Sequence, residues 1–230
     1  YDFFFKKFGR RGLDNRNTRI IGMTHTVRVQ DVLSQPASTV NLFYLNAFYC
    51  PACGRDGLGM MVYGEGLPGN VTVNVGGTRV SVRNFAGSLD VVAHELTHGV
   101  TAFSSNLLCC NEPGALNEAF SDMMGSSVEF YVGPGNYLMG DRLVTPLVAG
   151  FVRSLQDPLA FGTPDNYAIR LTGSADNGQV HDNSTIPSHV LMVGLQAGAP
   201  DTTIGAFTIV ARDFANVPDA GKLIEFRILL

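Results

Sequence analysis

The stretch that most limits what this chain can fold into runs from Asp90 to Asp122 and is centred on His94-Glu95-Leu96-Thr97-His98. On an α-helix, residues four apart are separated by one turn and about 40°, so the imidazoles of His94 and His98 lie above one another on one face. Two imidazoles placed in this way can hold one ion together, which is the geometry that a zinc site needs. The spacing therefore predicts a helix that carries metal ligands.

The helix around this motif has its own start signals. Ser88 is a suitable N-cap, and Asp90 places a negative charge in the first turn, where it complements the helix dipole. A buried face is predicted by the recurring apolar residues Val92, Leu96, Val100 and Phe103. The alternative interpretation of the motif is a pair of helix histidines that pack or face solvent.

A second helix is predicted from about Pro113 to Tyr131. Proline is well tolerated in the first turn because it lacks only an amide proton that the helix does not use. Glu118 and Asp122 are four residues apart and share a face of this helix. This is the arrangement of a metal-binding carboxylate and its supporting neighbour.

The composition of the 230-residue chain narrows its class. With 45% apolar residues it can bury a substantial core, so disorder is not expected. The net charge is -4 and no long run of Lys or Arg occurs, which argues against nucleic acid and favours a peptide or small molecule as partner. No apolar run approaches the roughly 20 residues that span a bilayer, and the start lacks the pattern of a signal peptide.

Residues 1–83 have the pattern of strands and turns around one short helix. Tyr1 to Phe8 is expected to end a helix that Gly9 stops, and the alternating, β-branched stretch from Arg19 to Val29 predicts a strand. Further strands are predicted over 40–49 and 60–63, with a hairpin over 71–82 that turns at Gly76-Gly77. Together these elements predict a strand-rich lobe.

Beyond Gly133, glycine and proline residues break any long element until helices are predicted over 185–198 and 203–215. The expected fold class is α+β with two lobes. Residues 1–103 form the strand-rich lobe and end in the motif helix, while residues 104–230 form a mainly helical lobe. The helix of the His94-to-His98 motif would lie between these two parts of the chain.

Four cysteines form two close pairs, Cys50 with Cys53 and Cys109 with Cys110. An even number fits disulfides in an oxidising compartment as well as it fits reduced thiols. A four-thiolate metal site is less favoured, because adjacent residues rarely point at the same ion. We expect a disulfide or plain thiols, and the pairing stays open.

The two predicted helices resemble those of a known family. Gly87 to Thr101 and Gly114 to Asp122 are similar, nearly residue for residue, to the signature helices of the thermolysin-like family of secreted zinc metallopeptidases. The 19 residues between His98 and Glu118 also match that family. Weaker similarity runs from Tyr1 to about Arg227, through residues 46–48, 61–64, 153–158 and 176–181. The resemblance implies the two-lobed fold of this family, in a divergent or incomplete member that lacks the beginning of the first lobe and the last helices.

The resemblance also implies a chemistry for the motif. His94, His98 and Glu118 would bind one catalytic zinc ion and leave a fourth position for water. Glu95 would act as the general base that takes a proton from that water. Asp122 would accept the outer N–H of His94 and orient its ring. The implied activity is that of a zinc endopeptidase.

Further residues match positions that stabilise the reaction or hold the substrate in this family. His181 would donate to the oxyanion, and Asp176 would hold its imidazole in the donating tautomer. Arg153 would bind the peptide carbonyl after the scissile bond. Asn46 and Ala47 lie on an expected edge strand, which can pair with an extended peptide through main-chain hydrogen bonds.

The substrate implied by the resemblance is a peptide or protein with an apolar residue on the leaving-amine side. Phe85, Val91 and Val152 are candidate walls of the pocket for this residue, although apolar residues more often form core. The resemblance further implies a secreted, extracellular protein, which we expect to be a monomer.

Calcium is the other ion that the resemblance implies. Asp90, Glu129, Asn136 and Asp141 match a buried calcium site, where oxygen ligands would tie the two helices to the following loop. Asn136 and Asp141 replace residues with longer or charged carboxylates, so weaker binding or a single ion is expected. For Asp90, the alternative is a simple helix-capping charge.

Three departures from the family lead to an alternative function. Cys109 stands where the family has a tyrosine that assists the oxyanion, and the loss of one such donor typically costs about 10² to 10³ in rate. Tyr49 replaces a tryptophan, and residues 50–58 have the pattern of an insertion near the cleft, where a disulfide to Cys109 or Cys110 would link the two sides. The alternative is therefore a metal-bound, catalytically weak peptide-binding protein or a fragment of a larger assembly.

Overall fold

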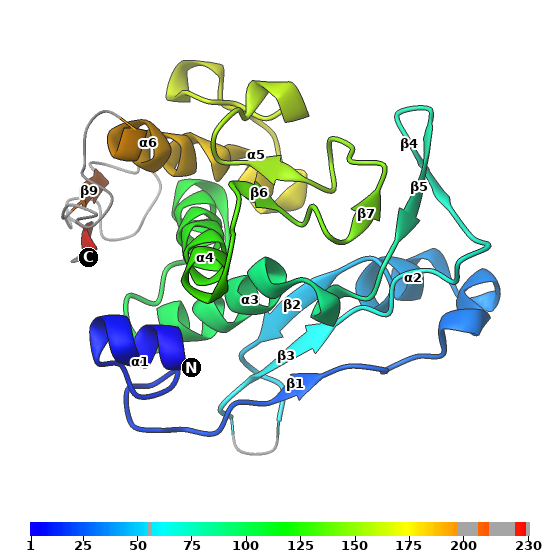
Figure 1. The fold of residues 1–230 in the computed structure, drawn as a ribbon, viewed down its shortest axis with the longest axis horizontal. Coiled ribbons are helices and arrows are strands. Elements are labelled where there is room, and N and C mark those ends of the chain that lie inside the picture. The colour runs from blue at the N-terminus through cyan, green and yellow to red at the C-terminus, as the bar shows by residue number, and fades with distance from the viewer. Residues whose placement is uncertain (55–56, 197–206, 212–223, 229–230) are drawn as a thin grey trace.

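Two lobes lie on either side of a central pair of helices in the computed structural model, which describes residues 1–54, 57–196, 207–211 and 224–228. The central helices are α3 (Leu89–Ala102) and α4 (Asn111–Val132). In Figure 1 a small sheet lies below them, and the C-terminal helices lie above them. This arrangement is the predicted α+β fold with two lobes, whereas the boundary at residue 103 stays a prediction.

The N-terminal lobe contains short helices and two small sheets. Its elements are α1 (Asp2–Phe8), β1 (Gly22–Met23), η1 (Val29–Ser34), α2 (Ala37–Phe43), β2 (Ala47–Cys50), β3 (Met60–Tyr63), β4 (Val73–Val75), β5 (Thr78–Val82) and η2 (Phe85–Gly87). Strand β3 is central in the order β1-β3-β2 and pairs antiparallel with β2, with Ala47 opposite Tyr63. Strand β2 is therefore an edge strand, as predicted.

Several N-terminal predictions are confirmed and two are wrong in part. Gly9 ends α1 in a left-handed conformation, and β4 and β5 form the predicted hairpin. The predicted strand over 19–29 is reduced to β1, because the chain turns at His25, where φ is 57°. The predicted strand over 40–49 begins as helix α2, because a short apolar run fits either periodicity.

The C-terminal lobe contains α4 and the elements that follow it. These are β6 (Leu138–Met139), β7 (Val144–Thr145), β8 (Arg153–Ser154), η3 (Leu159–Phe161), η4 (Tyr167–Ile169), α5 (Asp176–Asn183), α6 (Thr185–Gln196), β9 (Phe207–Ala211) and β10 (Ile224–Ile228). The helix predicted over 203–215 is wrong where the structure describes it, since β9 pairs antiparallel with β10. Residues 197–206 and 212–215 lie outside the described residues. None of the described helices has both the length and the apolar character needed to span a bilayer.

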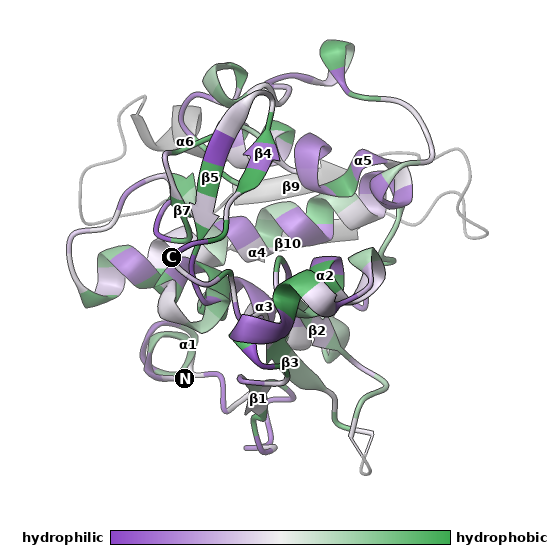
Figure 2. Cartoon of the chain, turned by 90° about the vertical axis from the view of Figure 1, so that its right-hand side faces the viewer, coloured by the Kyte–Doolittle hydropathy of each residue, from purple (hydrophilic) through white to green (hydrophobic). Residues whose placement is uncertain are grey.

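The core of the N-terminal lobe joins the strands to the start of α3. Its buried members are Met61, Tyr63, Val80, Val82, Phe85, Leu143, Val144 and Val152. Strand β7 comes from the second lobe and pairs with β5, so this core ties the two lobes together. Hydrophilic and hydrophobic residues are interleaved along α4 (Figure 2), because this buried helix also carries polar site residues.

Helices α3 and α4 approach closely at Gly125. A methyl group on Gly125 would lie 2.6 Å from the carbonyl oxygen of Asp90 in α3. The Asp90 carboxylate accepts the hydroxyl of the N-cap residue Ser88 and, at 2.6 Å, the backbone N–H of Gly140. The contact at Gly125 fixes the start of α3 against α4, and the Asp90 carboxylate ties it to Gly140 in the chain beyond α4.

We therefore expect Gly125→Ala to lower the free energy of unfolding by about 1–3 kcal/mol, because the added methyl group overpacks the helix contact. Urea unfolding followed by circular dichroism measures the change. Gly133→Ala is the matched control, since no atom lies within 4 Å of a methyl group at that position and its φ is -176°. Equal stability of the two variants would contradict this account of the helix contact.

Candidate metal centre

Three side chains from α3 and α4 converge on one point. The Nε2 atoms of His94 and His98 lie 3.0 Å apart. The carboxylate of Glu118 lies 3.2 Å from Nε2 of His94 and 3.4 Å from Nε2 of His98. Among the described residues, this is the one set of three or more His, Cys, Asp or Glu whose ligand atoms all lie within 4.8 Å of one another.

The outer nitrogens of both histidines have acceptors, which assigns their tautomers. Nδ1 of His94 lies 2.8 Å from Oδ1 of Asp122, and Nδ1 of His98 lies 3.1 Å from Oδ1 of Asn117. In neutral rings the protons therefore belong on Nδ1, so both Nε2 lone pairs face each other and the Glu118 carboxylate. Lone pairs and a carboxylate at this separation repel unless a cation lies between them. The donor set fits a metal ion with two imidazoles and one carboxylate.

Without a metal ion, His94 can take up a proton instead. Burial lowers the pKa of His94, but the carboxylates of Asp122 and Glu118 outweigh this effect and raise its pKa to about 10. Burial also raises the pKa of Glu118, yet the neighbouring histidines hold it well below its usual value. The centre therefore attracts positive charge, whether as protons or as a metal ion.

Glu95 follows His94 on α3 and is nearly as buried as its neighbour. Its Oε2 atom is buried and has no hydrogen-bond partner among the described residues. Burial raises the pKa of this carboxyl, while the positive charge of His94 and His98 lowers it in part. A buried carboxyl with a free oxygen and a raised pKa can accept and return a proton at the centre.

Asp122 contacts Arg153 as well as His94. Arg153, in β8, donates from Nε and Nη2 to the two carboxylate oxygens at 2.7 and 2.6 Å. Burial raises the pKa of Asp122, but Arg153 and His94 outweigh it, so the pKa lies below its ordinary value. Asp122 therefore stays ionised and orients an arginine and a histidine together. The link from Asp122 to Arg153 was not predicted from the sequence.

His181 approaches the centre from α5. Its Nε2 lies 3.3 Å from Oε2 of Glu118, and its Nδ1 lies 2.8 Å from Oδ1 of Asp176. The chain reaches this position through Asp176, Asn177 and Gln179, all with positive φ. Burial lowers the pKa of His181, but Glu118 and Asp176 raise it above its ordinary value. The structure thus brings His181 and Asp176 to the centre as the sequence predicts.

The predicted substrate-binding residues lie beside the centre. Asn46 precedes the edge strand β2, which begins at Ala47, and α3 packs on this strand. Phe85, Val91 and Val152 pack in one hydrophobic cluster, where Phe85 and Val152 are buried. Because core residues pack in the same way, their role as pocket walls stays a prediction.

Only some of the predicted calcium ligands lie close to one another. The amide of Asn136 donates to Oδ2 of Asp141 at 2.9 Å, and the guanidinium of Arg142 lies 3.6 Å from Glu129. Both Glu129 oxygens and Oδ1 of Asp141 are buried and lack hydrogen bonds among the described residues. Asp90, Glu129 and Asp141 nevertheless do not meet the spacing that the histidine centre meets. Calcium therefore stays a prediction.

The cysteines resolve into two different pairs. Cys50 and Cys53 form a disulfide, while Cys109 and Cys110 are free thiols. The structure therefore contains neither the four-thiolate site nor a disulfide between the two pairs. Cys109 is exposed at the start of α4, where a tyrosine was expected from the family pattern.

The fold and the centre define a class: a two-lobed α+β protein with a His-His-Glu metal centre on two adjacent helices. The profile of the "Thermolysin metallopeptidase, catalytic domain" matches residues 1–102. The profile of the "Thermolysin metallopeptidase, alpha-helical domain" matches residues 105–214. The chain therefore belongs to the thermolysin metallopeptidase family.

Individual relatives agree with this assignment. The chain is 37% identical over 205 residues to a bacillolysin of Bacillus caldolyticus and 36% identical to a thermolysin of Alicyclobacillus acidocaldarius subsp. acidocaldarius, with 86% of this chain covered in each case. It spans only 31% of the length of these relatives. Among solved structures, the precursor of protealysin, a metalloproteinase from Serratia proteamaculans, has a TM-score of 0.64 and 28% identity, and the match covers 86% of this chain and 56% of that one.

Asn117 provides a test of the assigned tautomer of His98. We expect Asn117→Leu to weaken zinc binding about 10- to 100-fold, because Nδ1 of the ring loses its nearer polar partner and keeps only the Ser121 hydroxyl at 3.3 Å. Competition with a chromophoric chelator measures the affinity. Ser127→Ala is the control on the same helix, where the hydroxyl donates only to the Met123 carbonyl. Unchanged affinity in Asn117→Leu would show that its amide does not select the tautomer.

Proposed function

We propose that this protein is a zinc-dependent endopeptidase. The observation that carries the proposal is the position of the two Nε2 atoms of His94 and His98, which lie 3.0 Å apart and face the Glu118 carboxylate. Glu95 lies on the same helix as the two histidines. His94, His98 and Glu118 would hold the ion. Bound zinc would polarise a carbonyl and lower the pKa of a water molecule to about 7.

The remaining residues of the centre would then handle protons and charge. Glu95 would take a proton from the attacking water and pass it to the leaving amine, which its raised pKa supports. His181, whose pKa Glu118 and Asp176 raise above its ordinary value, would donate to the oxyanion of the tetrahedral intermediate. Arg153, fixed by Asp122, would present its remaining N–H groups to the peptide carbonyl after the scissile bond.

The substrate would be an extended peptide that pairs with the edge strand β2 at Asn46 and Ala47. Main-chain pairing gives little sequence selectivity, so an apolar pocket walled by Phe85, Val91 and Val152 would select the residue on the leaving-amine side. The disulfide between Cys50 and Cys53 supports a secreted protein, because disulfides persist in oxidising compartments. We also propose that the protein acts as a monomer.

A structural calcium ion is part of the proposal. Asp90, Glu129, Asn136 and Asp141 surround the junction of the two central helices with the 136–141 loop, and three of their oxygens are buried without hydrogen bonds. Burial and the Asp90 carboxylate raise the pKa of Glu129, and a bound cation would relieve this repulsion.

Glu95→Gln tests the mechanism. We expect this variant to bind one zinc ion per chain but to cleave an unfolded protein substrate at least about 10²-fold more slowly, because the amide cannot take a proton. Cleavage by the parent should stop when a chelator removes zinc and return when zinc is restored. Glu112→Gln, on the first turn of α4, is the control and should retain activity.

Retained cleavage in Glu95→Gln would refute the role of Glu95. The other candidate function, a metal-bound but catalytically weak peptide-binding protein, is favoured by the exposed thiol of Cys109 at the tyrosine position of the family. Zinc at one per chain, with peptide binding but without cleavage in the parent, would establish this alternative.

Asp176→Asn tests the support of His181. The carboxylate of Asp176 raises the pKa of His181, so its removal should lower that pKa and move the alkaline limb of kcat/KM to lower pH. We also expect kcat/KM at neutral pH to fall about tenfold, because the donor to the oxyanion is less well oriented. Zinc content should not change. An unshifted alkaline limb would show that Asp176 serves only the backbone turn.

A further inference from the structure

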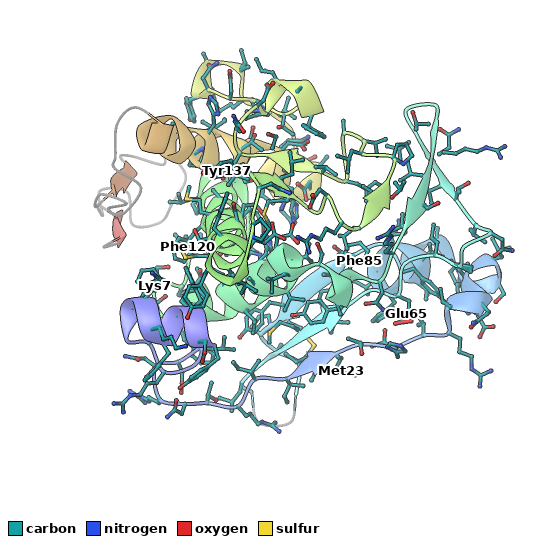
Figure 3. The ribbon with its side chains drawn as sticks, in the orientation of Figure 1. Lys7, Met23, Glu65, Phe85, Phe120 and Tyr137 are labelled. Carbon is teal, nitrogen blue, oxygen red and sulfur yellow. A yellow bond between two sulfur atoms is a disulfide. The ribbon has the colours of Figure 1, made fainter. Side chains whose placement is uncertain are left out.

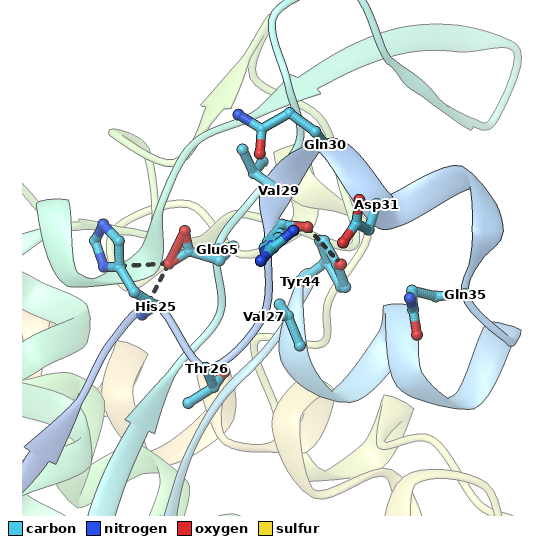
Figure 4. A pocket seen from close by; sticks show the side chains of 10 residues that line it. His25, Thr26, Val27, Val29, Gln30, Asp31, Gln35, Tyr44 and Glu65 are labelled. Atoms are coloured by element: carbon cyan, nitrogen blue, oxygen red, sulfur yellow. Dashed lines mark hydrogen bonds and ion pairs between the residues drawn. The ribbon is translucent and has the colours of Figure 1, made fainter.

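A cavity of about 680 Å³ lies in the N-terminal lobe (Figure 4). One wall is the segment 25–31, which follows β1 and includes the start of η1, and the others include Gln35, Tyr44 and Glu65. Its size is within the range of about 300–1,000 Å³ that is typical of ligand sites. None of its lining residues takes part in the metal centre.

The backbone of the cavity is continuous with the edge strand proposed to bind substrate. The N–H of Gly64 donates to the carbonyl of Asn46 at 2.8 Å, and the N–H of Gly66 donates to the carbonyl of Tyr44 at 2.8 Å. Glu65 lies between these two glycines and points into the cavity. The cavity therefore begins where strand β2 begins.

The cavity also adjoins the pocket proposed for the residue after the scissile bond. The N–H of Phe85, a proposed wall of that pocket, donates to the carbonyl of Gly64 at 3.0 Å. The amide of the preceding residue, Asn84, donates to Oε1 of Glu65 at 2.9 Å. Figure 3 shows Phe85 and Glu65 near one another at the start of α3. Two hydrogen bonds therefore link a lining residue of the cavity and its neighbour to the proposed pocket.

The buried charge of the cavity is negative. The side chain of Glu65 is only 8% exposed, and its Oε1 accepts from two neutral donors, the Asn84 amide and the backbone N–H of His25. Among the described residues, no lysine or arginine lies within 4.0 Å of it, and the nearest imidazole, that of His25, is 3.5 Å away and 79% exposed. A buried carboxylate without a cation is costly, so a cationic group is its natural complement.

Besides Glu65, the lining contains one further acid, Asp31, and one arginine, Arg28. Tyr44 is fully buried, and its hydroxyl donates to the carbonyl of Arg28 at 2.8 Å. Burial raises the pKa of Tyr44, and the carboxylates of Asp31 and Glu65 raise it further. Arg28 also lines the cavity but is exposed to solvent, and it has no ion pair with Asp31 or Glu65 among the described residues. The desolvated charge at the bottom of the cavity is therefore that of Glu65.

We propose that this cavity is a subsite for a basic side chain of the substrate, on the leaving-amine side and beyond the residue in the apolar pocket. Glu65 would pair with the lysine or arginine, and Asp31 would attract it at the rim. The proposal rests on the proposed peptidase function, to which it adds a second determinant of specificity.

Quenched peptides with the same core and an apolar residue after the scissile bond test the subsite. Lysine or norleucine is placed at the second, third or fourth position after that bond. We expect lysine to raise kcat/KM about tenfold at one of these positions, through a charge-assisted hydrogen bond. In Glu65→Gln the preference should fall to about one, because the amide keeps the acceptor for Asn84 and His25 but removes the charge. Asp2→Asn, on α1, is the matched control and should keep the preference.

Cleavage of all peptides with no preference for lysine would overturn the subsite and leave the peptidase function intact. A preference for a free carboxylate at the peptide end, lost in Arg28→Gln, would overturn it as well. If no peptide is cleaved, the proposed peptidase function is wrong. Binding of labelled peptides to the zinc-loaded Glu95→Gln protein then tests whether the cavity binds a basic side chain. Tighter binding of the lysine peptide, lost on adding Glu65→Gln, would support the subsite, and equal binding would overturn it.

Discussion

The structure depends on holding the Nε2 atoms of His94 and His98 3.0 Å apart in a buried place, with their lone pairs facing each other. One helix supplies both rings, but the acceptors that fix their tautomers, Asn117 and Asp122, come from α4 together with Glu118. The contact between the helices must therefore be exact to a fraction of an ångström. Gly125 permits that approach, and the Asp90 carboxylate ties the start of α3 to Gly140, in the chain beyond α4. The packing of α3 against α4 therefore determines the geometry of the metal centre.

Features of the centre that depend only on residues close together in the sequence could be predicted. The positions of His94 and His98 follow from helical periodicity, and the two central helices begin and end within two residues of the expected places. The hairpin at Gly76-Gly77 and the end of α1 at Gly9 were predictable for the same reason. Each of these features is decided by residues a few positions apart.

Features decided by distant residues could not be predicted in this way. The pairing of Asp122 with Arg153 joins residues 31 positions apart, and nothing in either local sequence indicates it. The stretch from Arg19 to Val29 alternates like a strand, but its turn at His25 is held by Glu65, 40 positions further on. The resemblance to the thermolysin family supplied some distant contacts, such as His181 near Glu118, because it carries tertiary information that periodicity lacks.

The buried carboxylates differ in whether a positive group of the same chain lies beside them. This difference indicates which of them would bind a proton or a ligand from outside the chain. Asp122 has Arg153 and His94, and Glu118 has three imidazoles, so their charges are compensated within the chain. Glu95 and Glu65 have no lysine or arginine within 4.0 Å among the described residues. Burial without a cation raises the free energy of a charge, and folding tolerates this where a proton or a ligand completes the site. For Glu95 the proposed completion is a proton in transit, and for Glu65 it is a cationic group of the peptide that we propose to bind there.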